Sequence, residues 1–321
     1  MNATTKRDLL SLKNLSRADM EQIFALTRAL KRKQKRGISH RLLAGKTLAM
    51  IFEKPSLRTR VTFEVGMVQL GGHAVFLGPS EIQIGVRETS ADCGRSLSRW
   101  VDLIMIRTFS HTTVEELAAN ASVPVINGLT DLFHPCQVLA DCYTLLEHKK
   151  SLDGLKIAFI CDGNNMAHTW IQAAEKYALS FAIACPRQYE PRTDIAREAA
   201  KGGAEIFVTQ EVQEAVRDAD VIYTDVWTSM GQENERDTRL RAFQRYQVNE
   251  ELLAVARKTA VVMHCLPAHR GEEITAEVLE SPQSIVFDQA ENRLHLQKAL
   301  MVWLLKASKG SRAKTVKASR Q

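Results

Sequence analysis

The sequence lacks the cysteine patterns of disulfide-stapled and zinc-stabilised proteins. Its six cysteines are scattered, with no C-x-x-C pair and no Cys/His spacing suited to zinc. We therefore expect reduced thiols in a cytoplasmic protein. The chain also has no apolar run long enough to span a bilayer and no signal-peptide core after Met1. On this basis we expect no membrane partner.

The second half lacks the glycine-rich turn of dinucleotide-binding proteins. Its first strand–helix turn, Asp162-Gly-Asn-Asn165, holds one glycine where the G-x-G-x-x-G fingerprint holds three. The missing glycines remove the close backbone approach that a pyrophosphate needs. We therefore consider a NAD-dependent dehydrogenase much less consistent with the sequence than a small-molecule transferase. No cofactor is expected.

The composition is that of an ordinary globular protein. The 321 residues are 45% hydrophobic and 25% charged, and the length is enough for two domains. The net charge of +6 is concentrated in residues 31–36 and in a tail from Lys306 to Arg320. Such runs attract nucleic acid in some proteins, but a solvated helix end and a frayed terminus explain them more simply. With no nucleic-acid motif beside them, we expect no nucleic-acid partner.

The stretch from Phe52 to Arg60 is the first candidate site. An apolar run, residues 47–52, predicts a buried strand, Pro55 interrupts it, and a helical pattern follows from Arg58. The free N–H groups and positive dipole at a helix start favour an anion. Arginines and hydroxyls at this junction are donors that suit phosphate or carboxylate. The alternative is a capped helix with solvated arginines.

The rest of the chain alternates predicted strands and helices. This pattern predicts an α/β fold of two domains, each a parallel-sheet three-layer αβα sandwich. We expect a domain boundary in the polar stretch 149–154, giving domains over 1–150 and 151–290. The last segment, 291–321, is expected to be a helix to about Lys306 that returns to the first domain, followed by the basic tail. A final strand is expected over 284–287, just before that helix.

Three polar side chains directly follow predicted strands of the first domain: Arg58, Arg107 and His134. Pro135 suits the first position of the helix that begins after His134. In parallel sheets, ligands collect beyond the carboxyl ends of the strands. The shared placement of the three residues therefore predicts one binding site.

Four segments occur together in a characteristic order: Phe52–Arg60, His134–Asp141, Asp225–Gly231 and His264–Gly271. Together they resemble the signature of the ornithine carbamoyltransferases, within the aspartate/ornithine carbamoyltransferase superfamily. The likeness extends from Arg7 to about Lys306. Ser229-Met230-Gly231 and His264-Cys-Leu-Pro267 are the parts that point to ornithine.

The resemblance implies a reaction and an assembly. The δ-amine of L-ornithine would attack the carbonyl of carbamoyl phosphate to give L-citrulline and phosphate, as a step of arginine biosynthesis. The first domain would bind carbamoyl phosphate and the second ornithine, in a homotrimer or a multiple of it whose active sites lie between domains near subunit interfaces. A neighbouring possibility keeps the chemistry but uses putrescine or an N-acylated ornithine. A non-catalytic anion-binding or nucleic-acid-binding protein is the alternative from another class.

The resemblance also assigns site residues. Carbamoyl phosphate would be held by Ser56, Leu57, Arg58, Thr59, Gln83 from the adjacent subunit, Arg107, His134, Gln137 and Arg293. Ornithine would be held by Asn165, Asp225, Ser229, Met230, Cys265 and Leu266. The catalytic group would be Arg107, His134 and Cys265. The simpler alternatives are a surface salt bridge for Arg58, a solvated strand end for Arg107, a helix cap for His134 and a small buried thiol for Cys265.

One position departs from the family pattern. Leu57 stands where the family's anion loop, here residues 52–60, usually has threonine, so a hydroxyl donor is lost. We expect little effect, since the backbone N–H at a helix start survives the change.

The proton of the ornithine amine could pass to Cys265 or to the leaving phosphate. No metal is expected, because neither His264 nor His269 has a partner at ligand spacing in the sequence.

Overall fold

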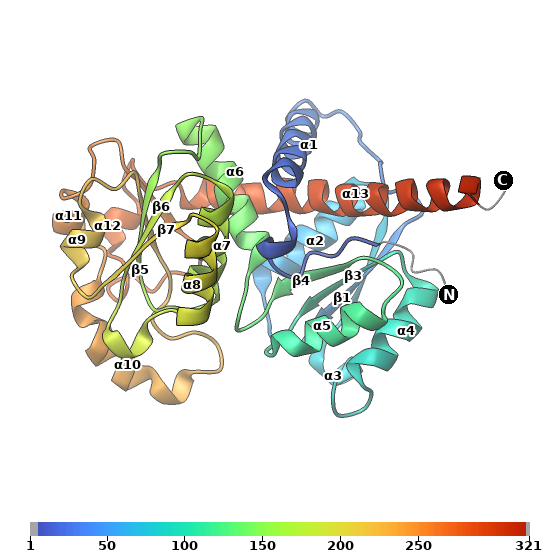
Figure 1. Cartoon of the computed structure of the whole chain (residues 1–321), viewed down its shortest axis with the longest axis horizontal. Coiled ribbons are helices and arrows are strands. Elements are labelled where there is room, and N and C mark those ends of the chain that lie inside the picture. Colours follow the sequence, from blue (N-terminus) through green and yellow to red (C-terminus); the bar gives the residue numbers. More distant parts are fainter. Residues whose placement is uncertain (1–5, 319–321) are drawn as a thin grey trace. The chain divides into compact units, whose positions relative to one another are not determined.

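The computed structural model describes residues 6–318, with side chains as far as Lys306. Contacts divide the chain into two compact units, Met1–Leu139 with Arg293–Gln321, and Ala140–Asn292. The predicted α/β class is confirmed, since each unit is a parallel sheet with helices around it (Figure 1). The domain bounds drawn from the sequence stay a prediction. Within the described part of the chain, no helix is both long enough and apolar enough to cross a membrane.

The first unit is built on a four-stranded sheet in the order β2-β1-β3-β4. Its strands are β1 (Thr47–Phe52), β2 (His73–Leu77), β3 (Leu103–Arg107) and β4 (Val125–Leu129). Its helices are α1 (Arg17–Lys35), α2 (Leu57–Gln69), α3 (Pro79–Ile82), α4 (Ser90–Trp100), α5 (His111–Asn120) and the first part of α6 (Pro135–Lys149). A 3₁₀ turn, η1 (Leu12–Asn14), precedes α1.

Alternation along the strands decides which helices cover which face. Ala49 and Ile51 of β1 share one buried cluster with Leu97 of α4 and Leu117 of α5. Because successive strand side chains point to opposite faces, the residues between them face the other layer. Figure 1 shows α4 and α5 together on one side of this sheet and α1 and α2 on the other. The three-layer arrangement expected from the sequence follows.

The second unit is built on a five-stranded sheet in the order β7-β6-β5-β8-β9. Its strands are β5 (Lys156–Ile160), β6 (Ser180–Ala184), β7 (Glu205–Thr209), β8 (Val221–Thr224) and β9 (Val261–His264). Its helices are α7 (Asn165–Lys176), α8 (Thr193–Lys201), α9 (Val212–Val216), α10 (Arg236–Phe243), α11 (Glu250–Leu253) and α12 (Ala276–Leu279). Three 3₁₀ turns are η2 (Arg187–Tyr189), η3 (Glu233–Glu235) and η4 (Gln244–Tyr246).

The last helix, α13, runs from Val286 to Ala318. The prediction of a strand over 284–287 was wrong: Ser284 makes only an isolated bridge to Val262, and the helix has already begun at Val286. A short apolar run before a helix fits either a strand or the first turn of that helix, and here packing decided. The side chains of the basic tail after Lys306 lie outside the described residues.

The prediction that this helix returns to the first unit is confirmed. Lys298 Nζ donates to Gln69 Oε1 of α2 at 2.7 Å, and Trp303 Nε1 donates to Gln22 Oε1 of α1 at 3.1 Å. The helix passes close to α2 at Gly66, where an added Cβ would lie 3.3 Å from Lys298 Cγ. The anion loop before α2 is thereby tied to the C-terminal helix.

A close helix contact in the first unit yields a stability prediction. A Cβ added at Gly94 of α4 would lie only 2.7 Å from Leu117 O, a backbone atom of α5. We expect Gly94→Ala to lower the free energy of unfolding by about 1–3 kcal/mol, because the two helices must separate. Urea unfolding followed by circular dichroism measures the change.

Gly66→Ala is the matched control, since it also replaces a mid-helix glycine with a better helix former. Its new Cβ would meet side-chain atoms, Lys298 Cγ at 3.3 Å and Met301 Cε at 3.4 Å, which can shift. We expect Gly66→Ala to be clearly less destabilising than Gly94→Ala. Equal unfolding energies for the two variants would show that the α4–α5 approach is not tight.

Candidate active site

The anion loop lies where β1 leads into α2, as the sequence predicted. Ser56 is the N-cap of α2, and its Oγ accepts a hydrogen bond from Thr59 N at 3.2 Å. Leu57 is the first helical residue and is 72% exposed, so its side chain is directed away from the buried part of the loop. Arg58 is half-buried and Thr59 fully buried. The helix start thus presents backbone donors beside one guanidinium.

Parallel pairing brings the next predicted residue to the same edge. Phe52, the last residue of β1, pairs with Arg107, the last residue of β3. Both strands therefore end together, and the loop after β1 lies beside the Arg107 side chain. Arg107 is only 5% exposed. The alternative of a strand end in solvent does not describe this arginine.

Arg293, at the start of the α13 segment that belongs to this unit, joins the loop by two hydrogen bonds. Its Nη2 donates to Thr59 Oγ1 at 2.8 Å, and its Nη1 donates to Gln137 Oε1 at 2.5 Å. All three side chains are buried. The guanidinium therefore links α2, α6 and α13, three elements far apart in the sequence.

His134 lies among these arginines. The pKa of His134 is held well below its usual value of 6.5 by burial, and the positive charges of Arg293, Arg107 and Arg58 lower it further. The ring is therefore neutral at physiological pH and keeps one N–H as a hydrogen-bond donor.

Gln83 is the predicted carbamoyl phosphate ligand that does not join this cluster. It ends α3 in the left-handed conformation, with φ of 42°, and its side chain is exposed. Its carbonyl accepts hydrogen bonds from Val86 N and Arg87 N at 3.0 Å each, which folds the surface loop locally. Its predicted contribution to a neighbouring subunit stays a prediction.

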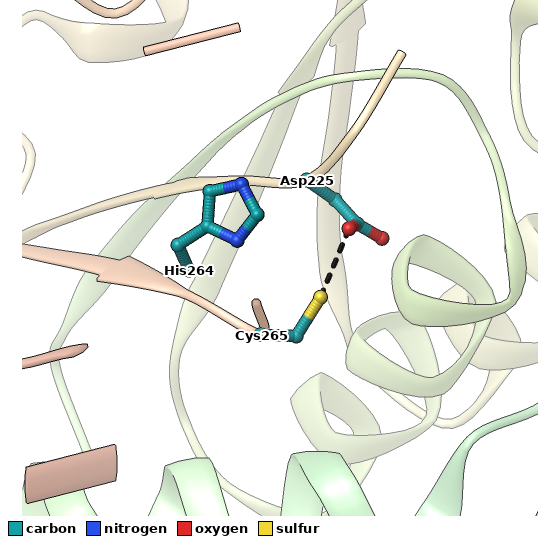
Figure 2. Close-up of side chains that lie close together, drawn as sticks. All are labelled: Asp225, His264 and Cys265. Carbon is teal, nitrogen blue, oxygen red and sulfur yellow. Dashed lines mark hydrogen bonds between the residues drawn. The ribbon is translucent and has the colours of Figure 1, made fainter. Parts of the chain in front are cut away.

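In the second unit, Asp225 follows β8 and is 7% exposed. Its Oδ1 accepts hydrogen bonds from Cys265 Sγ at 2.9 Å and from Val226 N at 2.8 Å (Figure 2). Its Oδ2 accepts a third bond from Asn164 Nδ2 at 3.0 Å. The carboxylate is held in a fixed orientation by donors from the ends of three neighbouring strands, β5, β8 and β9.

Asn164 is a residue that the sequence reasoning missed. It is the N-cap of α7, and its Oδ1 accepts from Met166 N and Ala167 N. This cap leaves its amide group free to reach Asp225. The signal was present in the turn Asp162–Asn165, because asparagine is a preferred helix N-cap. Asn165, the predicted ligand, is the half-buried first residue of α7.

The remaining predicted ornithine ligands lie on two loops. Ser229 and Met230 follow Asp225 on the segment between β8 and α10, and Met230 is 43% exposed. Cys265 and Leu266 follow β9 and are both half-buried. Pairing of Thr224 with His264 brings the ends of β8 and β9 together. The bases of both loops therefore meet at Asp225.

His264 and His269 both have close acidic neighbours, so the expectation from linear spacing was wrong. The side chains of Asp225, His264 and Cys265 lie within 4.8 Å of one another at their ligand atoms (Figure 2). Those of His269, Glu272 and Glu273 form a second such group. Asp225 comes from a separate strand end, which motif spacing does not reveal, whereas Glu272 and Glu273 follow His269 by three and four residues, a spacing that the sequence reasoning overlooked. The absence of a metal from the reaction stays a prediction.

His264 has a structural role that its position explains. Leu266 N donates to His264 Nδ1 at 2.8 Å, so the proton is on Nε2, which donates to buried Glu273 Oε1 at 3.0 Å. Glu273 Oε1 also accepts from His269 N at 2.6 Å. The pair shapes the turn that carries Cys265 and Leu266.

Comparison with known proteins agrees with both halves of this geometry. Residues 7–147 match the family model described as aspartate/ornithine carbamoyltransferase, carbamoyl-P binding domain. Residues 153–304 match the model described as aspartate/ornithine carbamoyltransferase, Asp/Orn binding domain.

Individual relatives cover nearly the whole chain. An ornithine carbamoyltransferase of Syntrophus aciditrophicus is 53% identical over 301 residues, which is 94% of this chain and 100% of the relative. The solved structure of the Pyrococcus furiosus ornithine carbamoyltransferase is 48% identical with a TM-score of 0.89, covering 94% of this chain and 97% of that one. An anabolic ornithine carbamoyltransferase of Campylobacter jejuni is 37% identical with a TM-score of 0.88, covering 93% and 98%. The resemblance drawn from the four motifs is confirmed, and the chain belongs to the aspartate/ornithine carbamoyltransferase family.

Proposed function

We propose that the protein transfers the carbamoyl group of carbamoyl phosphate to the δ-amine of L-ornithine, giving L-citrulline and phosphate in arginine biosynthesis. The observation that carries the proposal is the buried cluster at the carboxyl ends of β1 and β3, where Arg107 ends its strand beside the anion loop and Arg293 bonds Thr59 and Gln137. Relatives more than 50% identical over 94% of the chain carry the name ornithine carbamoyltransferase, which supports the choice of acceptor.

The first unit suits the charge of carbamoyl phosphate. The amides at the start of α2, with Ser56, Arg58 and Thr59, offer donors to the phosphate oxygens. Leu57 would contribute its backbone N–H, which fits its exposed side chain. Gln137 is held by Arg293 and would complete this set.

The carbonyl oxygen gains negative charge as the amine attacks. Arg107, His134 and Thr59 are the donors that we assign to it, as in an oxyanion site. A neutral imidazole suits this role because it donates a hydrogen bond without adding a fourth positive charge. As the C–N bond forms, the bond to the phosphate oxygen breaks and phosphate leaves with its electron pair.

The second unit suits a free amino acid. Asp225 would pair with the α-ammonium of ornithine, Asn165 with its α-carboxylate or α-ammonium, and Ser229 with the same end. Met230 and Leu266 would pack on the methylenes. The δ-amine must lose a proton, and the two acceptors that we assign to it are the leaving phosphate and the thiolate form of Cys265, since the thiol that donates to Asp225 already carries its proton. We propose no metal and no cofactor for this chemistry.

We also propose that the chain works as a homotrimer that supplies Gln83 to a neighbouring site. Helix α2 supports this, because four apolar side chains at helical spacing are exposed along it: Leu57 (72%), Val61 (46%), Val65 (37%) and Val68 (66%). Such a stripe on a surface helix is typical of a contact between proteins.

The cytoplasmic location that we propose fits six free cysteines, five of them buried.

An assay with three amines tests the acceptor. We expect citrulline from L-ornithine without added metal or nucleotide, at mildly alkaline pH, since an alkyl amine has a pKa of about 10.4. Putrescine and an N-acylated ornithine should react at least about 100-fold more slowly in kcat/KM, because Asp225 would be left without its cation. Preference for putrescine would overturn the acceptor, and no product from any amine would reject carbamoyl transfer.

Replacement of Arg58 tests the anion loop. We expect Arg58→Ala to raise the KM for carbamoyl phosphate about 10- to 100-fold, the range for losing a charge-assisted hydrogen bond, with an unchanged circular dichroism spectrum. Arg60→Ala is the control, because exposed Arg60 lies over the Phe76 ring at 3.7 Å and 3.6 Å from Glu64. Unchanged kinetics in Arg58→Ala would remove this loop from the site.

The neutral state of His134 can be followed directly. Its folded pKa lies below the unfolded value of about 6.5, so the unfolded chain takes up a proton first as the pH falls. The free energy of unfolding should therefore drop below pH 6.5, by up to about 1.4 kcal/mol per pH unit from this residue. His134→Gln should make that drop shallower.

The direct measurement is the NMR titration of the His134 ring, which we expect to stay neutral from pH 8 to 6 in the folded protein. In denaturant the same ring should titrate near 6.5. A folded-state midpoint at 6.5 would contradict the proposed cluster of guanidiniums.

A further inference from the structure

The segment that carries Ser229 and Met230 begins at buried Trp227, which stacks on Phe243 with ring centroids 6.1 Å apart, and becomes exposed at Met230. Two hydrogen bonds fold the turn locally: Ser229 N donates to Gln232 Oε1 at 3.1 Å, and Gly231 N donates to the Glu233 carboxylate at 3.0 Å. Neither bond connects the turn to the core of the unit. Its two ends, at Asp225 and α10, are tied to buried groups of the unit.

Arg239 of α10 supplies the anchor. It is 5% exposed, and its Nη1 donates to Trp227 O at 3.0 Å and to Asp162 Oδ2 at 2.8 Å. Its Nε donates to Glu235 Oε2 at 3.1 Å, and its guanidinium lies over the Tyr189 ring, 4.6 Å from the centroid. The planar guanidinium donates to Asp162, Trp227 O and Glu235 at the same time, which a lysine ammonium cannot reproduce.

The two contacts of Nη1 join the two segments that hold the predicted amino-acid ligands. Trp227 lies two residues before Ser229, and Asp162 lies two residues before Asn164, whose amide donates to Asp225. The segments leave adjacent strands, β8 and β5. One guanidinium thus bridges the two segments at the edge that carries Asn165, Asp225 and Ser229.

We infer that Arg239 is a positioning residue for the amino-acid acceptor, holding the Trp227–Gly231 segment against the Asp162–Asn165 turn so that Ser229 and Asn165 face the same molecule. The inference rests on the proposed function and deepens it, since it names what sets acceptor recognition. Arg239 does not touch the acceptor itself. Its loss should act on ornithine and leave carbamoyl phosphate, which the other unit binds, unaffected.

The charge of Asp162 makes the contact sensitive to acid. Burial raises the pKa of Asp162 to about 6, against the opposing effect of Arg239, and Asp225 raises it while the hydrogen bond from Cys161 lowers it. Arg239 is faced by Glu235 and Tyr189 besides Asp162. Protonation of Asp162 below about pH 6 would leave Arg239 with a neutral partner and loosen the segment.

Steady-state kinetics of Arg239→Lys test the inference. Lysine keeps the charge opposite Asp162 but cannot donate to Trp227, Asp162 and Glu235 together. We expect the KM for ornithine to rise about tenfold or more, while the KM for carbamoyl phosphate changes less than twofold. Arg241→Lys, an exposed arginine on the same helix, is the matched control and should leave both constants unchanged.

Amide hydrogen exchange gives a readout that needs no activity. Residues 228–235 should exchange faster in Arg239→Lys than in Arg241→Lys, with the exchange of β5 and β8 unaltered. The wild-type protein gives the same test without substitution: exchange of 228–235, relative to an exposed segment of the same chain, should increase as the pH falls through about 6. Asp162→Asn should remove that step.

The outcomes separate this inference from the proposed function. A wild-type protein that makes no citrulline overturns the function, whatever Arg239 does to the segment. Citrulline formation with an unchanged ornithine KM in Arg239→Lys overturns the positioning role. Equal rises in both KM values, or faster exchange throughout the unit, assign Arg239 to fold stability alone and also overturn it.

Discussion

The placement of the site residues depends on one constraint. In each sheet two central strands pair in parallel, and the connections that follow them run to opposite faces of the sheet. In the first unit β1 and β3 are neighbours, and in the second β5 and β8 are neighbours. The connections that follow such a pair cross to opposite faces and open a crevice at the carboxyl ends. Arg58 and Arg107 follow the first pair, and Asn164 and Asp225 follow the second. The same topology thus places side chains of different charge at the carboxyl-terminal edges of the two sheets.

Charge distinguishes the two edges. The first gathers guanidiniums around an imidazole that burial and their own field keep neutral. Buried positive charge of this kind is stable only when an anion or hydrogen-bond acceptors face it, and Gln137 Oε1 and Thr59 Oγ1 are such acceptors for Arg293. The second edge centres on the Asp225 carboxylate, whose orientation is fixed by three donors.

Second-layer contacts give both edges their geometry. Arg293 holds Thr59 and Gln137 in the first unit, and Arg239 holds the Trp227 carbonyl and Asp162 in the second. Each guanidinium uses its planar fork to join segments that the chain does not connect directly. Preorganisation of this kind reduces the ordering that a substrate must impose when it binds. The Trp227–Gly231 segment depends most on this preorganisation, because its turn is exposed.

Local sequence determined the fold class, most helix starts and the anion loop, because apolar periodicity, proline and capping residues act over a few positions. The four ordered motifs determined the family. Packing alone decided which distant residues meet: Arg293 reaches Thr59 across 234 positions, and Asn164 reaches Asp225 across 61. It also decided that residues 286 and 287 begin a helix rather than end a strand. Such pairings depend on the relative positions of whole elements, and no short stretch of sequence encodes these.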